Sequence, residues 1–260
     1  MQSIEVRDHN VRLLVSSVAG QETCVYANID GCAIVVDMGC VPEEQVVLAE
    51  RVFVTHTHID HVHGVTKHAA LRRLRSIKPA RYYCAPATVP KLERLFEATE
   101  ELQESQIAHE IVPMAPSHNV PVQLFRGVSV VAFATVHRVQ SQGYMFTKRS
   151  FKLKPELMGL PGHEIAARRR NGEYTHDMTD TLVLCVTGDT TAEALDRHPL
   201  CYEAKILVVE CTYITDEIAP SKAHERGHIH INDLVARAHL FQNDVLVLMV
   251  KQSPSYSSIK

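Results

Sequence analysis

The sequence has no apolar stretch of the roughly 20 residues that a helix needs to cross a bilayer. The segment from Met1 to Asp8 lacks both the apolar core of a secretory signal and the character of a basic amphipathic presequence. The 7 cysteines never form a Cys-x-x-Cys pair, and several lie in apolar runs, as Cys185 does. This pattern predicts buried, reduced thiols. We therefore expect no membrane association and a cytoplasmic location, with a nuclear or organellar pool as the alternative.

Charge of one sign is also lacking, since the formal net charge is only −3. Any binding of nucleic acid must therefore depend on local basic patches. With 45% hydrophobic and 22% charged residues, the composition is that of an ordinary globular protein. The 260 residues contain no internal repeat, low-complexity segment or linker, so we expect a single domain over residues 1–260. The 16 histidines are many for this length and favour a metal enzyme.

Six short apolar runs end in a polar residue that is capable of chemistry. Their β-branched composition predicts buried strands, and amphipathic stretches between them predict helices, which together indicate an α/β fold. We expect the strand ends to meet at one edge of a sheet, where sites form in open α/β sheets. The runs are Ala33–Val36 before Asp37, Val52–Val54 before His56, Val128–Ala134 before His137, Leu182–Val186 before Asp189, Ile206–Val209 before Glu210, and Val245–Val250 before Lys251. The expected helices are Val65–Ile77, Val89–Leu102, Thr191–Arg197 and Asn232–Phe241.

The segment from Thr55 to Gly64 is the most distinctive part of the chain. It holds four histidines and an aspartate with the spacing His-x-His-x-Asp-His, directly after the apolar run Val52–Val54. Neutral imidazole and carboxylate groups are the ligands that zinc prefers, and buried polar groups are costly unless they are bonded. A solvated histidine-rich loop is the alternative, but the segment is internal and flanked by apolar sequence. We therefore predict a metal site at the end of this strand.

This motif resembles the metal-binding signature of the metallo-β-lactamase superfamily. The likeness extends from about Asp37 to the C-terminus and is greatest to the ribonuclease Z branch, the tRNA 3′-processing endonucleases. The segment from His137 to Tyr144 and the segment Thr187-Gly188-Asp189-Thr190 resemble further motifs of that branch. The resemblance implies an αββα sandwich, in which two mixed sheets lie face to face and helices cover the outside.

The resemblance also implies a metal site of Zn²⁺, one or two ions per chain, with Mn²⁺ as an alternative. Asp37 would support the histidine loop without binding metal, although a turn carboxylate before Gly39 is the other interpretation. The implied ligands are His56, His58 and His137 for the first ion, Asp60 and His61 for the second, and Asp189 as a bridge between them.

Two segments resemble a carboxylate–imidazole pair of ribonuclease Z, which is thought to protonate the leaving oxygen. The carboxylate is Glu210 and the imidazole is His228. A carboxylate-oriented imidazole is a competent general acid near neutral pH. Asp60 is expected to orient the attacking oxygen. The alternative for His228 and His230 is a structural pair in a loop that enters a helix.

The C-terminal strand departs from the family pattern, which has a metal-binding histidine at the position of Lys251 and an arginine at that of Ser255. An ammonium group has no free lone pair for a metal. We therefore hypothesise that the second metal is weakened or absent. Alternatively, His230, a water or a deprotonated Lys251 completes the shell, or the protein is less active than its relatives.

A basic insertion at about residues 148–178 includes the loop-like stretch Phe151 to Asp177. It occupies the place of the flexible basic arm with which ribonuclease Z enzymes hold tRNA, and Gly159 to Gly162 resembles part of that arm. Such a loop can neutralise phosphates, although a plain solvated loop is the alternative. A second basic segment, Arg72 to Arg81, either contacts the acceptor stem or forms a solvated helix face. The candidate RNA-binding residues are Lys148, Arg149, Lys152, Lys154, Arg168, Arg169 and Arg170.

Taken with the resemblance, these residues predict a metal-dependent phosphodiester hydrolase that removes 3′ trailers from precursor tRNA as a homodimer. One alternative is a hydrolase of the same fold that acts on another ester or on a small phosphodiester. The other is a weakly active or inactive RNA-binding or partner homologue, for which Lys251 is the main support.

Overall fold

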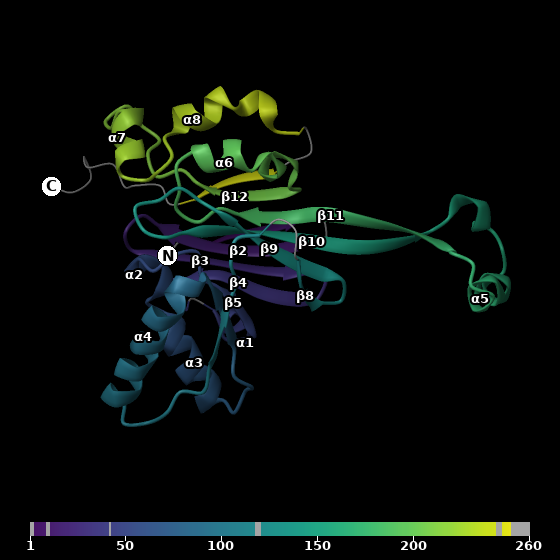
Figure 1. The fold of residues 1–260 in the computed structure, drawn as a ribbon, viewed down its shortest axis with the longest axis horizontal. Helices are drawn as coiled ribbons and strands as arrows, with labels where there is room; N and C mark the ends of the chain where they lie inside the picture. The colour runs from purple at the N-terminus through teal and green to yellow at the C-terminus, as the bar shows by residue number, and fades with distance from the viewer. Residues whose placement is uncertain (1–2, 9–10, 42, 118–120, 243–245, 251–260) are drawn as a thin grey trace.

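The computed structural model describes residues 3–8, 11–41, 43–117, 121–242 and 246–250. These residues form two sheets that lie face to face, and helices cover both outer surfaces (Figure 1). The predicted αββα sandwich is therefore confirmed. The termini of the described chain both belong to the sandwich, since the first strand is an edge of one sheet and the last strand is an edge of the other.

The first sheet has seven strands in the order β1-β2-β3-β4-β5-β6-β7. Its first four strands are antiparallel neighbours, and its last four are parallel neighbours, so the sheet is mixed. Figure 1 shows α1, α3 and α4 on its outer side. The strands are β1 (Ser3–Asp8), β2 (Val11–Val18), β3 (Glu22–Ile29), β4 (Cys32–Met38), β5 (Arg51–Phe53), β6 (Arg81–Cys84) and β7 (Glu110–Pro113). The helices of this half are α1 (Glu44–Leu48), α2 (Ile59–Val62), α3 (Val65–Leu74) and α4 (Val89–Leu102).

The second sheet has six strands in the order β13-β12-β11-β10-β9-β8. Strands β8 to β11 are antiparallel neighbours, and β11, β12 and β13 are parallel. Figure 1 shows α6, α7 and α8 on its outer side. The strands are β8 (Val122–Phe125), β9 (Val128–Ala134), β10 (Gln142–Leu153), β11 (His176–Val186), β12 (Ile206–Glu210) and β13 (Leu246–Val250). The helices of this half are α5 (Gly162–Arg170), α6 (Glu193–Arg197), α7 (Pro220–Glu225) and α8 (Ile231–Ala236).

Alternation along the strands divides the core into layers. In β4, Ile34 and Val36 join the cluster between the sheets, whereas Val35 joins the cluster under α3 and α4. Successive side chains of a strand point to opposite faces, so a strand that is covered on both sides must be apolar on both. In the layer between the sheets, the Phe53 ring stacks on Tyr83 with a centroid separation of 4.7 Å. This rigid core fixes the strand ends that carry the polar residues.

The predicted strands are confirmed, and the helices differ mainly at their ends. The expected helix at 89–102 coincides with α4, and the expected helix at 65–77 ends at Leu74, shortly before Ser76, whose φ is 54°. The expected helix at 232–241 divides into α8 and a 3₁₀ turn, Ala238–Leu240. The prediction that the strand ends meet at one edge of a single sheet was wrong, because β4 and β5 belong to one sheet and β11 and β12 to the other.

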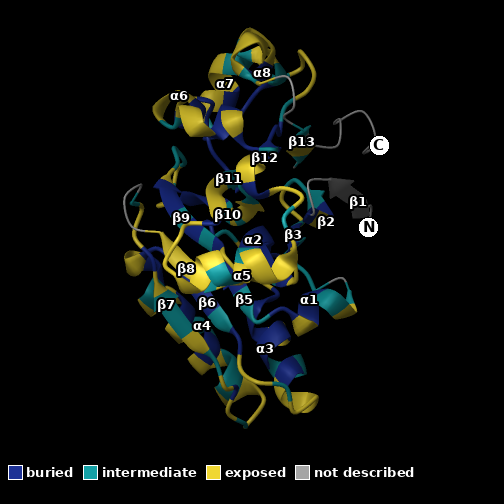
Figure 2. Ribbon diagram, turned by 90° about the vertical axis from the view of Figure 1, so that its right-hand side faces the viewer, coloured by how far each residue is buried: buried dark blue, intermediate teal, exposed yellow. Residues whose placement is uncertain are grey.

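The basic insertion is an ordered arm rather than a loop. Strands β10 and β11 extend beyond the rest of their sheet as an antiparallel ribbon, and α5 lies near its tip (Figure 1). Cα pairing continues as far as Leu153 and His176. The interpretation of Phe151 to Asp177 as loop-like was therefore wrong for both flanks and for α5, whose residues are all at least partly exposed (Figure 2).

All 7 cysteines lie in the described part of the chain as free thiols, and 6 of them are buried, as predicted. Among the described residues, no helix has the length and apolar character that a membrane span requires.

Candidate active site

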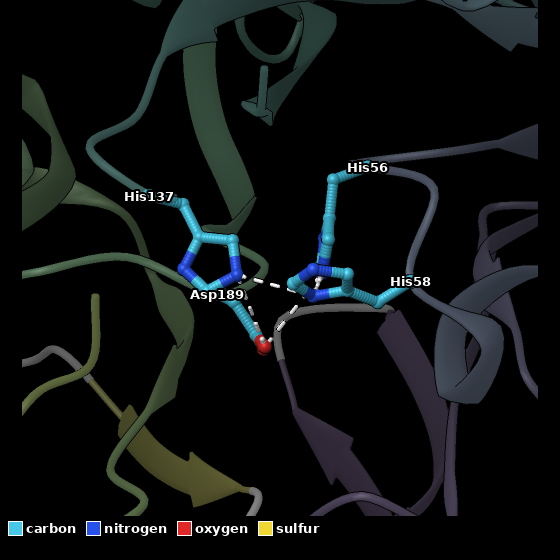
Figure 3. Close-up of side chains that lie close together, drawn as sticks. All are labelled: His56, His58, His137 and Asp189. Carbon is cyan, nitrogen blue, oxygen red and sulfur yellow. Dashed lines mark hydrogen bonds and ion pairs between the residues drawn. The ribbon is translucent and has the colours of Figure 1, made fainter. Parts of the chain in front are cut away.

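Four side chains from both sheets converge on one point (Figure 3). His56 and His58 follow β5 of the first sheet, and His58 is the N-cap residue of α2. His137 follows β9, and Asp189 follows β11, both in the second sheet. One ligand atom from each of these residues lies within 4.8 Å of those of the others. Residues separated by more than 130 positions in sequence thus form one compact group of metal-binding atoms.

The ring nitrogens in this group are directed at each other. His58 Nδ1 lies 3.0 Å from His56 Nε2 and 3.2 Å from His137 Nε2. Asp189 Oδ2 lies 3.7 Å from His56 Nε2 and 3.9 Å from His137 Nε2. Imidazole nitrogen and carboxylate oxygen are the donors that tetrahedral zinc sites use. The donor set therefore fits a zinc-class divalent ion.

Hydrogen bonds at the far side of two rings set their tautomers for metal binding. The carbonyl oxygen of Gly227 accepts a hydrogen bond of 2.8 Å from His137 Nδ1, which leaves the lone pair on Nε2. Thr55 Oγ1 donates to Asp37, so it accepts from His56 Nδ1 at 3.0 Å, and the lone pair of that ring also lies on Nε2. Ligand histidines are commonly oriented by a bond of this kind from their other nitrogen.

His61 and Asp60 form a second, adjoining group. His61 Nε2 lies 3.3 Å from Asp189 Oδ1 and 3.6 Å from Asp60 Oδ2. The two oxygens of Asp189 therefore face different groups, Oδ2 toward His56 and His137 and Oδ1 toward His61. This is the arrangement that a carboxylate bridging two ions would have.

Asp37 is the buried support of both groups. Its carboxylate accepts hydrogen bonds from the Thr55 amide at 2.8 Å, the Thr55 hydroxyl at 2.7 Å and His61 Nδ1 at 2.6 Å. The interpretation of Asp37 as a supporting group is consistent with these contacts. Thr55 was missed from the sequence, although a hydroxyl residue between the apolar run and His56 was an available signal. It connects Asp37 to both His56 and the backbone that carries the histidines.

A glycine lets the two sheets approach at the site. Gly188 has a φ of +64°, and a Cβ on it would lie 2.6 Å from the Cβ of Thr55. Only glycine adopts this conformation at low cost and leaves room for that contact. The Gly188–Asp189 turn of the second sheet can therefore pack directly on the histidine loop of the first.

Glu210, which is buried, and His228, which is partly buried, form a hydrogen-bonded pair beside the histidines. His228 Nδ1 donates to Glu210 Oε1 at 2.8 Å, and the rings of His228 and His137 lie 5.2 Å apart. Glu210 also accepts from the Thr212 amide at 2.9 Å and the Thr212 hydroxyl at 2.8 Å. Thr212 is a second residue that sequence analysis missed, although it lies two positions after the glutamate. These bonds hold the carboxylate rigidly and leave His228 Nε2 for a group outside the pair.

Burial and neighbouring charges set the proton affinities of the site. Burial lowers the pKa of His137 to about 4 and also lowers that of His56, so both rings are neutral at pH 7. Burial opposes a charge on His61, but the carboxylates of Asp37 and Asp189 outweigh it and raise its pKa to about 9. Burial raises the pKa of Glu210, against the lowering effect of His228. In the metal-free protein His61 is therefore protonated at pH 7, and a metal ion at Nε2 would have to displace that proton.

His230 does not reach the site. His230 is the N-cap of α8, where Nδ1 accepts from the Asn232 amide and Nε2 donates to the Thr215 carbonyl. With both nitrogens engaged in that way, the suggestion that His230 completes a metal shell is wrong for this conformation. Lys251 and Ser255 lie outside the described residues.

Most basic side chains of the second basic segment are engaged in contacts within the protein. Arg72 is buried and donates to the backbone carbonyls of Val47, Ala49 and Lys78, so it cannot contact an acceptor stem. Arg73 is exposed, and the three other members pair with carboxylates of the same half of the molecule. The pairs are Arg75 with Glu44, Lys78 with Glu50, and Arg81 with Glu110.

Some candidate RNA-binding residues of the arm are also paired. Arg149 donates two bonds of 2.8 Å to Asp180 across the ribbon, and Lys148 donates to Asp30 at 2.6 Å. Lys154 lies 3.9 Å from Glu156, and Arg168 lies 3.5 Å from Glu173. The basic side chains of α5, Arg168 to Arg170, are all exposed.

The chain is similar to known proteins over most of its length. Residues 38–249 match the family model of the beta-lactamase superfamily domain. The chain is 31% identical to tRNase Z TRZ1 of Arabidopsis thaliana over 235 residues, covering 90% of this chain and 82% of the relative. It is 32% identical over 164 residues to a nuclear ribonuclease Z of Triticum aestivum, covering 63% of this chain and 90% of that one.

Solved structures show the same fold. The short form of human tRNase Z aligns with a TM-score of 0.63 at 18% identity, covering 95% of this chain and 93% of that one. The metallo-beta-lactamase fold protein YhfI of Bacillus subtilis aligns with a TM-score of 0.62 at 14% identity, covering 94% and 87%. The chain therefore belongs to the beta-lactamase superfamily and, within it, to the tRNase Z (ribonuclease Z) family.

Proposed function

We propose that this protein is a metal-dependent endoribonuclease that removes 3′ trailers from precursor tRNA. The observation that carries the proposal is the convergence of a histidine–aspartate metal group with the hydrogen-bonded Glu210–His228 pair at one edge of the sandwich. A metal group alone would suit any hydrolase of this fold, but a carboxylate-oriented imidazole beside it suits a reaction in which an alkoxide leaves. The relatives named tRNase Z support precursor tRNA as the substrate.

We assign the metal ligands as expected from the sequence. His56, His58 and His137 would hold the first ion, and Asp60 with His61 would hold the second. Asp189 would bridge them, since its two oxygens face the two groups. The nitrogen-rich donor set favours zinc, with manganese as an alternative. When bound, such an ion supplies Lewis acidity to the scissile phosphate and lowers the pKa of water.

The remaining steps are carried by side chains of the chain. Asp60, which is buried beside His61, orients the attacking oxygen on one side of the phosphorus. His228 transfers a proton from Nε2 to the departing ribose oxygen, while Nδ1 donates to Glu210. Glu210 stabilises the protonated imidazole before transfer, and Thr212 holds Glu210 in place. Asp37 keeps His61 in the tautomer that presents Nε2.

The second metal is the part of the site that we expect to be weak. Lys251 stands where the family has a ligand histidine, and His230 is engaged as a helix cap. A zinc titration of the metal-free protein should give one tight and one weak site. Two sites of equal affinity would contradict this expectation.

The arm is the proposed tRNA-holding element. Its ribbon places α5 at the end of the molecule away from α2, whose N-cap is His58, so contacts there would add affinity for a long substrate without touching the reacting phosphate (Figure 1). Arg149 donates two bonds of 2.8 Å to Asp180, whereas the exposed Arg168 makes one longer contact of 3.5 Å with Glu173. We therefore expect Arg168, Arg169 and Arg170, which are all exposed, to contribute most of the phosphate contacts.

A homodimer is proposed on the outer face of the first sheet. Leu74 at the end of α3 and Leu102 at the end of α4 are 80% and 87% exposed, and a groove of about 550 Å³ lies between the two helices. The exposed charges of α3 are basic and most of those of α4 are acidic, so a two-fold axis would pair unlike charges. Leu102→Glu should convert a dimer to a monomer in light scattering, whereas Val235→Glu on α8 should not. A monomeric wild-type protein would contradict the proposal.

A cytoplasmic location is consistent with the free thiols, since reducing compartments preserve them.

The test of the function is cleavage of a 3′-extended precursor tRNA with zinc or manganese, and with chelator. Release of the trailer should need metal and should be lost in His58→Ala. His63→Ala is the matched control, because His63 lies in the same segment but is exposed and outside both donor groups. No cleavage, with tRNA still bound, would favour an inactive partner. No cleavage and no binding would favour small esters or phosphodiesters.

A further inference from the structure

The turn that carries His228 also carries an arginine. Arg226 ends α7, and Gly227 and His228 follow it directly. Gly227 has a φ of +80°, and its carbonyl accepts from His137 Nδ1 at 2.8 Å. A Cβ on Gly227 would lie only 2.7 Å from that nitrogen, so the backbone of this turn packs directly on a candidate metal ligand. The arginine is therefore attached to one of the most constrained parts of the site.

Tyr213 holds the arginine side chain next to His228. Arg226 Nη1 donates to the Tyr213 hydroxyl at 3.0 Å, and its Cζ lies 5.7 Å from the ring centroid. The Tyr213 ring also neighbours the His228 ring, at a centroid distance of 6.1 Å. The Tyr213 backbone is tied to the same segment, since its carbonyl accepts from Ile231 at 2.8 Å. Guanidinium, phenol and imidazole thus form a row, and both Arg226 and Tyr213 are partly exposed.

The charge of Arg226 matters because the site is rich in buried carboxylates. Asp37, Asp60, Asp189 and Glu210 are all nearly inaccessible to solvent. A polyanionic RNA strand that enters beside them needs compensating cations along its path, and phosphate contacts fix the register of a nucleic acid. Arginine suits this task, since its planar guanidinium binds phosphate with two parallel bonds and stacks on aromatic rings.

The proposed role of His228 decides which phosphate is in reach. If His228 protonates the departing ribose oxygen, that ribose lies on the His228 side of the scissile phosphate. The next phosphate on that side is the one 5′ of this ribose, within the mature tRNA. We propose that Arg226, held by Tyr213, binds this phosphate and so positions the 3′ end of the tRNA for cleavage. This inference rests on the proposed function.

The contact can be tested with a neutral methylphosphonate at single linkages of a precursor tRNA. On the all-phosphate substrate, Arg226→Gln should lower kcat/KM roughly 10-fold, mainly through KM, as expected for the loss of a charged hydrogen bond. With methylphosphonate at the linkage 5′ of the leaving ribose, wild type and Arg226→Gln should agree within about twofold. With methylphosphonate in the trailer, the roughly 10-fold difference should persist. On the all-phosphate substrate, the kcat/KM of Arg226→Lys should lie between those of wild type and Arg226→Gln.

Two arginines serve as controls. Arg12→Gln on β2 removes an exposed charge from an element that supplies no side chain to the site, and it should behave as wild type. Arg138→Gln removes an exposed charge close to Gly227, since a Cβ on that glycine would lie 3.2 Å from the Arg138 amide nitrogen. If Arg138→Gln also lost kcat/KM on the all-phosphate substrate but not on the 5′ methylphosphonate substrate, the general positive electrostatic potential of the region rather than a contact with Arg226 would be responsible. That result would overturn the proposal.

Folding and function can be separated in the same experiment. Zinc content and melting temperature report whether Arg226→Gln keeps its fold. If it does not, Tyr213→Phe removes only the hydroxyl that holds Arg226 and should lose about threefold, again only with the 5′ phosphate present. An undiminished loss on the 5′ methylphosphonate substrate would overturn the contact alone. No cleavage of precursor tRNA by wild type would overturn the proposed function and this contact with it.

Discussion

Replacement of Asp37 by asparagine isolates the support of the metal site from the ligands themselves. Asp37 has a φ of 58°, a conformation that asparagine tolerates as well as aspartate does. The amide oxygen can still accept from the Thr55 backbone, but the amide nitrogen replaces Oδ2, which accepts from the Thr55 hydroxyl and His61 Nδ1. The hydroxyl can rotate to accept from the new amide. With its proton on Nδ1, as metal binding at Nε2 requires, the His61 ring faces another donor.

The size of the effect follows from that single lost bond. A buried donor without its acceptor costs about 1–3 kcal/mol, which corresponds to a fall in melting temperature of roughly 5 °C for a chain of this size. Loss of a group that orients a ligand typically weakens metal binding about 10- to 100-fold. We therefore expect Asp37→Asn to be folded but to need about 10- to 100-fold more zinc for half saturation.

The assay is a competition titration with a chromophoric zinc chelator, combined with thermal melts of the metal-free protein. Asp30→Asn is the matched control. Asp30 also has a positive φ, of 50°, but it is exposed in the two-residue turn between β3 and β4, where Asn-Gly is favoured. It should bind zinc as wild type does. Zinc affinity of Asp37→Asn within twofold of wild type would refute the argument that this carboxylate prepares His61.

Three further outcomes are expected. Glu210→Gln should lower the single-turnover cleavage rate about 100-fold or more with little change in precursor tRNA affinity; an unchanged rate would exclude the pair as general acid. Treatment with chelator should abolish cleavage and lower the melting temperature, and zinc should restore both; a cleavage rate unaffected by metal removal would contradict the metal mechanism. Replacing Arg168, Arg169 and Arg170 by alanine should weaken tRNA binding. The slope of log binding constant against log salt concentration should become less negative by about 0.9 for each phosphate that is no longer neutralised, and an unchanged slope would exclude α5 from the interface.

The sequence predicted correctly those features that depend on residues close together in the chain, such as ligand spacing and helix periodicity. The spacing of His56, His58, Asp60 and His61 places four potential ligands on one turn, and no distant contact is needed to recognise it. The helix α4 was predicted at both ends because its apolar spacing is unbroken. In contrast, the helix expected at 232–241 breaks after Ala236, since its second half is exposed and gains little from packing.

In the arm, amino-acid composition gave the wrong secondary structure. Exposed, polar and basic residues suggested a loop, because half-buried periodicity is the usual sign of a strand. In the protein, β10 and β11 are paired with each other by backbone bonds as far as Leu153 and His176, beyond the part that packs on the core. This part of the ribbon has few apolar residues, and those it has, such as the paired Phe151 and Met178, are exposed. Ion pairs across it, such as Arg149 with Asp180, also occupy charges that composition alone assigns to RNA.

The sequence by itself determined the group of candidate ligands from His56 to His61 and the α/β class, because ligand types, their spacing and apolar runs are local properties of the chain; the αββα sandwich was implied by the family resemblance. Only the tertiary structure decided which distant residues complete the site. His137, Asp189 and the Glu210–His228 pair join the histidine loop because two facing sheets bring their strand ends together, and Gly188 lets them touch. It also decided that His230 caps a helix and that the Tyr213 ring has both Arg226 and His228 as neighbours. Contacts between the sheets depend on packing in three dimensions, which no spacing along the chain records.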